Sequence, residues 1–257
     1  MPEVLHDMAL PAPVYVYADL CSTLDVVHTL AKEHSLPPWT SIVARSQSGG
    51  RGQLRRQWES PVGNVYAALC LPCVQPFSTS ACAPAVGFLV VQALRRMGLE
   101  VCLKWPNDIV LWHGQKAYKV GGILVEEHQH GIWAGIGINI LHSPPESRLR
   151  PAYALPASHL SALLPSHTCS EEFHNIIKFW LHLVKEAFSC YETRVLAHDS
   201  WCEAASELLL WRGSMVNLYD DPLHIYARLA GIGPSGGVCL ERHGVVEEFF
   251  SGSLRLC

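Results

Sequence analysis

The residues best suited to chemistry gather in a glycine- and arginine-rich segment that runs from Arg45 to Pro61. Its sequence is RSQSGGRGQLRRQWESP, in which Leu54 is the only aliphatic residue. Glycine permits close backbone approach, and arginine presents a planar, permanently charged fork that matches phosphate or carboxylate oxygens. Trp58 adds a flat apolar surface that can face a ring. The segment predicts a loop that closes over an anionic ligand, although a solvated basic loop would use the same residue types.

A second segment with chemical potential combines two lysines with glycines. It reads Lys-Trp-Pro-Asn-Asp from Lys104 to Asp108, and then Lys-Val-Gly-Gly-Ile-Leu from Lys119 to Leu124. Adjacent glycines on a strand let a ligand lie against the backbone, and a nearby ammonium group can meet a carboxylate or a phosphate. A strand that follows a tight turn would explain the same pattern without a ligand.

Composition limits the kinds of partner that these segments serve. The chain has 257 residues, of which 49% are hydrophobic, and a net charge of -4. This charge disfavours a general nucleic-acid or anionic-membrane binder and indicates a local site for small anions. The ten cysteines are scattered, mostly in apolar segments, which favours free thiols in a reducing compartment. We expect a cytoplasmic protein without a membrane span, and a redox role for Cys70 and Cys73 is the weaker interpretation of their spacing.

The elements that must position these segments form a strand-rich core with helices between strands. Apolar patterns predict strands at 14–18, 41–44, 64–71, 101–105, 109–112, 121–126 and 131–138, and helices after Ser22 and Thr23, at 83–97 and at 171–191. Four more short strands are predicted at 215–218, 225–232, 237–241 and 245–250, which suits a small β-barrel. The fold class is therefore α+β, with a catalytic domain at 1–208 and a small β domain at 209–257.

Taken in order, the motifs resemble the biotin protein ligase family. They are Gly50-Arg51-Gly52 with Trp58, then the two lysine segments, then Gly-Ile-Gly-Ile-Asn from Gly135 to Asn139. The resemblance is close from about residue 15 to 139 and looser in the C-terminal strands. It implies a mixed-sheet catalytic domain like that of class II aminoacyl-tRNA synthetases, followed by an SH3-like barrel.

The resemblance also implies an activity. Such ligases activate biotin with ATP and Mg²⁺ to biotinyl-5′-AMP, and then transfer biotin to one lysine of a carboxylase carrier domain, the biotin carboxyl carrier protein. Members of the family often dimerise by pairing their sheets edge to edge, so the resemblance also allows a homodimer. Only about 13 residues precede the first predicted strand, which leaves no room for the winged helix of some members, and we expect no sequence-specific DNA binding.

Carried over residue by residue, the resemblance implies three sets of site residues and no metal site made by protein side chains alone. The catalytic set is Lys119, Arg51 and Asp108. The biotin set is Ser22, Thr23, Leu24, Gln47, Gly50, Arg51, Gly52, Gln53, Lys119 and Gly122. The ATP set is Arg56, Trp58, Lys104, Asn107 and Asn139.

Three positions depart from the family pattern. Gln53 stands where a second loop arginine is common, Arg55 where glycine is common, and Leu24 where asparagine commonly follows the Ser-Thr pair. Our hypothesis is that Arg51, Arg55 and Arg56 compensate for Gln53 in holding the adenylate. Two alternatives remain: a lipoate or octanoate ligase of the same superfamily, and a noncatalytic biotin sensor.

Overall fold

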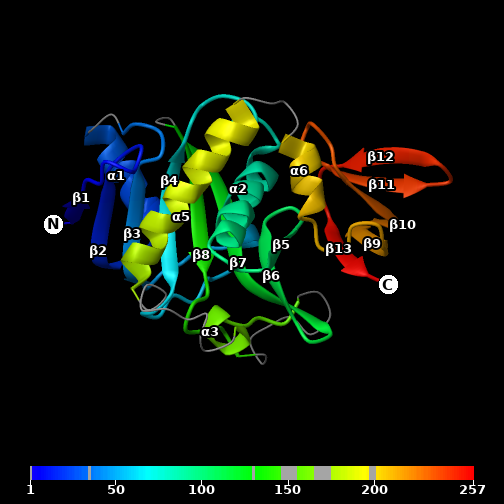
Figure 1. Cartoon of the computed structure of the whole chain (residues 1–257), viewed down its shortest axis with the longest axis horizontal. Helices are drawn as coiled ribbons and strands as arrows, with labels where there is room; N and C mark the ends of the chain where they lie inside the picture. The colour runs from blue at the N-terminus through cyan, green and yellow to red at the C-terminus, as the bar shows by residue number, and fades with distance from the viewer. Residues whose placement is uncertain (1, 34–35, 129–130, 146–154, 165–174, 197–200) are drawn as a thin grey trace.

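A computed structural model describes residues 2–33, 36–128, 131–145, 155–164, 175–196 and 201–257. Figure 1 shows a large sheet covered by helices and a second, smaller sheet that carries the C-terminus. This arrangement confirms the α+β class. None of the described helices is long and apolar enough to cross a membrane.

The large sheet has eight strands in the order β1-β2-β3-β4-β8-β7-β6-β5. The strands are β1 (Glu3–Leu5), β2 (Val14–Leu20), β3 (Ser41–Gln47), β4 (Val65–Leu71), β5 (Val101–Lys104), β6 (Asp108–His113), β7 (Lys116–His128) and β8 (Gly131–Ile138). The sheet is mixed, because β2 and β3 run parallel while its other neighbours are antiparallel. Every residue of β4 is buried, as expected for a central strand that is covered on both faces.

Helices cover both faces of the large sheet. In Figure 1, α2 (Cys82–Arg96) and α5 (Ile176–Cys190) cross one face. Helix α1 (Thr23–Glu33) packs on the other, where Leu24 joins Ile42 and Trp133 in a separate apolar cluster. Neighbouring Val43 belongs to the main core instead, because successive strand side chains point to opposite faces. The remaining short helical segments are Gln53–Arg55, Leu160–Leu163 (α3), Tyr191–Leu196 and Trp201–Glu207 (α6).

The second sheet is antiparallel and has five strands in the order β12-β11-β10-β9-β13. They are β9 (Met215–Asp220), β10 (Leu223–Ile232), β11 (Val238–Arg242), β12 (Val245–Phe249) and β13 (Ser253–Leu256). The chain reaches this sheet through α6 and a bridge between Leu103 and Leu209. The predicted boundary between 208 and 209 lies between α6 and β9 and stays a prediction.

Most predicted elements agree with the structure within a few residues, and the differences have physical causes. Strand β7 begins at Lys116 rather than at 121, because its polar first half pairs with β6. Strands β1 and β13 were not predicted, since each is short and polar in part. The predicted helix at 171–191 is α5 from Ile176, and residues 171–174 lie outside the described part of the chain.

Candidate active site

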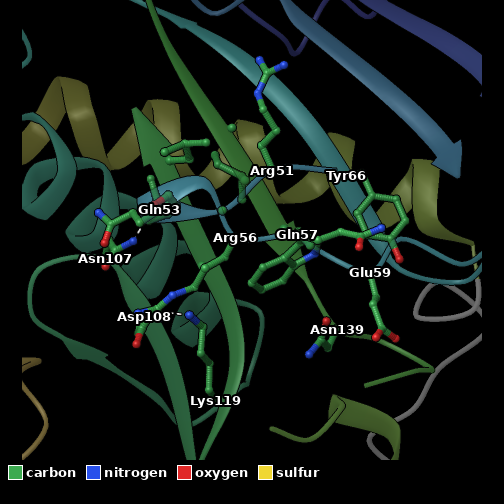
Figure 2. Close-up of a pocket in the computed structure, with 18 of the residues that line it drawn as sticks. Arg51, Gln53, Arg56, Gln57, Glu59, Tyr66, Asn107, Asp108, Lys119 and Asn139 are labelled. Atoms are coloured by element: carbon green, nitrogen blue, oxygen red, sulfur yellow. Dashed lines mark hydrogen bonds and ion pairs between the residues drawn. The ribbon is translucent and has the colours of Figure 1, made fainter. Parts of the chain in front are cut away.

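A cavity of about 720 Å³ opens beside α1 and is lined by the glycine- and arginine-rich loop and by strands of both sheets. Every residue assigned to the site from the sequence lines this cavity, with the exception of Gly50. Figure 2 shows Arg56, Asn107, Asp108, Lys119 and Asn139 around it. Segments that are far apart in the sequence are therefore brought together by the fold.

One end of the cavity is built from neutral hydrogen-bonding groups. The side-chain oxygen of Gln47, at the end of β3, accepts hydrogen bonds from the backbone N–H of Thr23 at 2.9 Å and from its hydroxyl at 3.3 Å. The Gln47 amide nitrogen donates to Ser60 Oγ at 3.0 Å. Ser22, Thr23 and Ser60 are all buried. This end can bind a neutral polar ring through fixed donors and acceptors.

Gly50 does not line the cavity but shapes the loop above it. Its carbonyl accepts a hydrogen bond from the Trp58 N–H at 2.9 Å. A Cβ at this position would lie 2.4 Å from the Trp58 carbonyl oxygen and 2.6 Å from Ser60 Oγ. Gly50 therefore allows two parts of the loop to approach closely, which is a role other than direct ligand contact.

Arg51 is engaged by two carboxylates of the protein. Its guanidinium pairs with Asp25 of α1 and, at 3.1 Å, with Glu126 of β7. Burial lowers the pKa of Arg51, but the hydrogen bonds and charges of both partners outweigh this effect and raise it. In Figure 2 the Arg51 side chain extends away from Lys119 and Asp108. Arg51 thus ties the loop to a helix and a strand. We call the side chains of Arg51, Asp25 and Glu126 the loop clasp.

The other end of the cavity is charged. Lys119 Nζ lies 2.5 Å from Asp108 Oδ1 and 5.5 Å from the centre of the Trp58 ring. Figure 2 shows the Arg56 side chain directed toward this pair. The pKa of Lys104 is lowered, chiefly because the side chain is buried. The charge of Asp108 opposes this shift, whereas the charges of Lys119 and Arg255 add to it. Cations at this density favour an anionic ligand, because an anion would offset their mutual repulsion.

Asn107 and Asn139 hold backbone segments in place around the charged end. The Asn107 side chain donates to the Ile123 carbonyl at 2.6 Å, and the Asn139 side chain donates to the Ser158 carbonyl at 3.1 Å. Both residues are buried. Their amide groups therefore fix the walls of the cavity, whatever contact they also make to a ligand.

Trp58 packs flat against glycines of the large sheet. A Cβ at Gly137 would lie 2.7 Å from the indole, and one at Gly122 would lie 3.2 Å from it. The indole N–H is buried without a hydrogen-bond partner among the described residues. The two glycines thus provide a slot for the ring between the neutral end and the charged end.

The three sets of site residues taken from the sequence leave out several residues of the cavity wall, some of which lie inside the motifs themselves. They are Leu54, Gln57, Glu59, Tyr66, Ala67, Ile123, Leu124, Gly135, Ile136, Gly137, Pro144, Leu155, Ala157, Gly252 and Ser253. Alternation along β7 and β8 could have identified those next to the predicted glycines. Gly252 and Ser253 carry no local signal, because only the docking of the second sheet brings them to the site.

Cys70 and Cys73 lie outside this cavity. Cys70 is buried, and burial, with a smaller contribution from Cys73, raises its pKa to about 12. A thiol with this pKa stays protonated at neutral pH and is a poor nucleophile. The environment of Cys70 therefore argues against a reactive redox pair.

Comparison with known proteins identifies a related domain. Residues 20–142 match the biotin/lipoate A/B protein ligase family. The bifunctional ligase/repressor BirA of Bacillus subtilis is 35% identical over 138 residues, which cover 50% of this chain and 41% of that protein. The biotin--[acetyl-CoA-carboxylase] ligase of Paracoccus denitrificans is 33% identical over 129 residues, covering 46% and 51%. The matches thus span about half the length of these relatives.

Solved structures extend the likeness in fold to nearly the whole chain. A biotin protein ligase from Aquifex aeolicus, in complex with biotin and ATP, superposes with a TM-score of 0.69 at 24% identity. The match covers 95% of this chain and 98% of that one. At this identity the match establishes the shared fold, including the second sheet.

Proposed function

The chain carries a domain of the biotin/lipoate A/B protein ligase family, and from this premise we propose that it is a biotin–protein ligase. It would activate biotin with ATP to biotinyl-5′-AMP and transfer biotin to a lysine of a carboxylase carrier domain. The name of the Paracoccus relative supports biotin as the acid and a carboxylase as the target. The bound ligands of the Aquifex structure agree with biotin and ATP as substrates.

One observation carries the proposal: a single cavity joins a neutral hydrogen-bonding end to a cationic end. The neutral end, around Thr23, Gln47 and Ser60, suits an uncharged cyclic urea, which both donates and accepts hydrogen bonds. The charged end, around Lys104 and Lys119, suits phosphates. A ligand that carries a carboxylate on a tail from the neutral end would reach the charged end, where activation takes place.

In the first step, an oxygen of the biotin carboxylate attacks the α-phosphorus of ATP, and the bond to the β-phosphate oxygen breaks. Biotinyl-5′-AMP and pyrophosphate are the products. Two anions must approach each other, so a fixed cation lowers the barrier. We assign this role to Lys119. Its ammonium group is already held in the cavity by the carboxylate of Asp108. At 4 Å and an effective dielectric constant near 20, such a cation contributes about 4 kcal/mol before desolvation.

Mg²⁺ would enter with ATP. The described residues include no group of three or more histidine, cysteine, aspartate or glutamate side chains that could hold a metal. This donor set fits an ion held chiefly by phosphate oxygens, with Asp108 as the protein carboxylate at the charged end. When bound, the ion would neutralise charge on the phosphates.

In the second step, the neutral amine of a carrier lysine attacks the acyl carbon of the adenylate. The bond between the acyl carbon and the phosphate oxygen breaks, and AMP leaves with that oxygen. Both Asp108 and Trp58 line the cavity. We assign to Asp108 the orientation of the incoming amine or the acceptance of its proton, and to Trp58 a flat surface for the adenine side. We assign Arg51 to the loop clasp, and we assign Arg56, whose side chain is directed toward Lys119 and Asp108, to the phosphates.

Pyrophosphate release by the purified protein tests this function. MgATP is supplied with biotin, lipoate, octanoate or no acid. We expect pyrophosphate release when biotin is the acid, and none with lipoate, with octanoate or without an acid. Release with lipoate or octanoate instead would move the protein to the sister activity, and no release with any acid would support a noncatalytic sensor.

A further inference from the structure

The Lys-Trp-Pro-Asn-Asp segment contains a tryptophan, Trp105, to which the proposed reaction gives no role. Lys104, Asn107 and Asp108 line the cavity, whereas Trp105 does not. Trp105 is only 2% exposed, and its indole N–H donates to the carbonyl oxygen of Gly236 at 2.9 Å. Gly236 belongs to the turn between β10 and β11, so this hydrogen bond joins the large sheet to the second sheet.

The turn that accepts this bond is closed by hydrogen bonds and lies close to Ala81. Gly233 and Gly237 close it with a backbone hydrogen bond of 2.9 Å, and the Gly237 N–H also donates to Glu248 at 2.9 Å. Gly236 has a φ of +85°, and a Cβ there would lie 2.3 Å from Cα of Ala81. Only glycine permits this conformation and this approach without strain.

A second hydrogen bond supports the same seat. The Ser80 hydroxyl donates to the Ser235 carbonyl at 2.7 Å, directly before α2. Among the described residues, two side-chain hydrogen bonds therefore hold this turn, beside a close backbone approach at Gly236. One is buried, at Trp105, and the other is exposed, at Ser80.

The second sheet also reaches the charged end of the cavity. Gly252 and Ser253, at the start of β13, line it together with Lys104. Arg255 of the same strand is close enough to lower the pKa of Lys104. The position of the second sheet therefore sets one wall and part of the electrostatic field at the end that we assign to ATP.

We propose that Trp105 is a positioning residue, which fixes the second sheet through Gly236 so that β13 completes the ATP end of the cavity. The assignment of that end to ATP rests on the proposed function. Trp105 acts through Gly236 and touches no reacting atom. Its substitution alters ATP binding and leaves the neutral end, built by α1 and β3, unchanged.

The test compares Trp105→Phe with the control Trp180→Phe. Trp180 is fully buried in α5, and its indole N–H has no hydrogen-bond partner among the described residues. Both changes remove the same volume, but only Trp105→Phe removes a hydrogen bond. Ser80→Ala is a milder change at the same seat, which keeps the test sharp if Trp105→Phe folds poorly.

Amide hydrogen exchange measures the contact without any substrate. We expect exchange in segments 81–86 and 233–237 to be about 3- to 10-fold faster in Trp105→Phe than in Trp180→Phe, because one buried hydrogen bond is lost. Ser80→Ala should show a smaller increase in the same segments. Equal exchange in Trp105→Phe and Trp180→Phe would overturn the proposal.

Steady-state kinetics measures the consequence for the site. In Trp105→Phe, the KM for ATP should rise about 3- to 10-fold while the KM for biotin stays at the wild-type value. An unchanged KM for ATP, or an equal rise in both, would overturn the proposal. Absence of biotin-dependent turnover in the wild-type protein would instead contradict the proposed function, and the exchange experiment would still decide whether Trp105 holds the second sheet.

Discussion

The two ends of the cavity are built on different principles. At the neutral end, Gln47 is fixed by hydrogen bonds to Thr23 and Ser60 before any ligand arrives. At the charged end, Lys119 and Asp108 neutralise each other across 2.5 Å. The neutral end thus offers shape and fixed donors, whereas the charged end must exchange an internal ion pair for contacts to an anion. Substitutions at the two ends should therefore have separable effects on the two substrates.

Loss of Lys119 should produce the largest effect. Lys119→Met should lower biotin-dependent pyrophosphate release at least about 100-fold, the usual scale for removing a preorganised group that stabilises developing charge. Lys116→Met is the control, because Lys116 is exposed at the start of the same strand and does not line the cavity. Unchanged release in Lys119→Met would remove this residue from its assigned role.

Loss of Gln47 should affect biotin selectively. Gln47→Leu leaves the Thr23 N–H without its acceptor and removes the donor to the Ser60 oxygen, so the KM for biotin should rise about 10-fold. The KM for ATP should stay the same, since the charged end is untouched. Steady-state kinetics with each substrate varied in turn measures both values, and a matching rise in the KM for ATP would break the distinction between the two ends.

The binding of ATP at the charged end should be accompanied by proton uptake at Lys104. Its pKa lies below the ordinary 10.5, and the negative charge of ATP raises it again. At a pH between the pKa of Lys104 in the free protein and its higher pKa in the ATP complex, binding should therefore take up protons. Calorimetry in two buffers of different ionisation enthalpy measures this uptake. Lys104→Met should abolish it, and proton release linked to Lys104 would contradict the assignment.

The loop clasp should give the smallest effect. Arg51, Asp25 and Glu126 are all partly exposed, so each pair contributes about 0.2 to 1 kcal/mol. Arg51→Gln should speed adenylate dissociation about 2- to 5-fold, and Asp25→Asn should add little on top of it. The comparison is measured by dissociation of labelled adenylate from the single and double variants. Fully additive effects would show that the two residues act independently.

The sequence predicted the cavity well where local signals exist. Glycine pairs and lysines on strands identified Lys119 and Gly122, and the Ser-Thr pair identified the start of α1. Arg51 shows the limit of such signals, because an arginine that pairs with carboxylates of its own protein has the same local sequence as one that binds a ligand. Only the fold brings Asp25 and Glu126 to it.

The residues that sequence reasoning missed depend on contacts between distant segments. Ser253 reaches the cavity because the second sheet packs against the rest of the chain, and the hydrogen bond from Trp105 to Gly236 is one of the contacts. No periodicity within β13 signals this position, since the strand has only four residues. The wall formed by the second sheet is therefore a property of the tertiary structure.

Detection of the intermediate tests the central claim most directly, because both ends of the cavity must work for it to form. The purified protein is incubated with biotin and MgATP in the absence of a carrier domain, desalted, denatured and examined by mass spectrometry. We predict biotinyl-5′-AMP in stoichiometric amounts with the protein. Absence of this adenylate, or formation of a lipoyl or octanoyl adenylate only, would contradict the account.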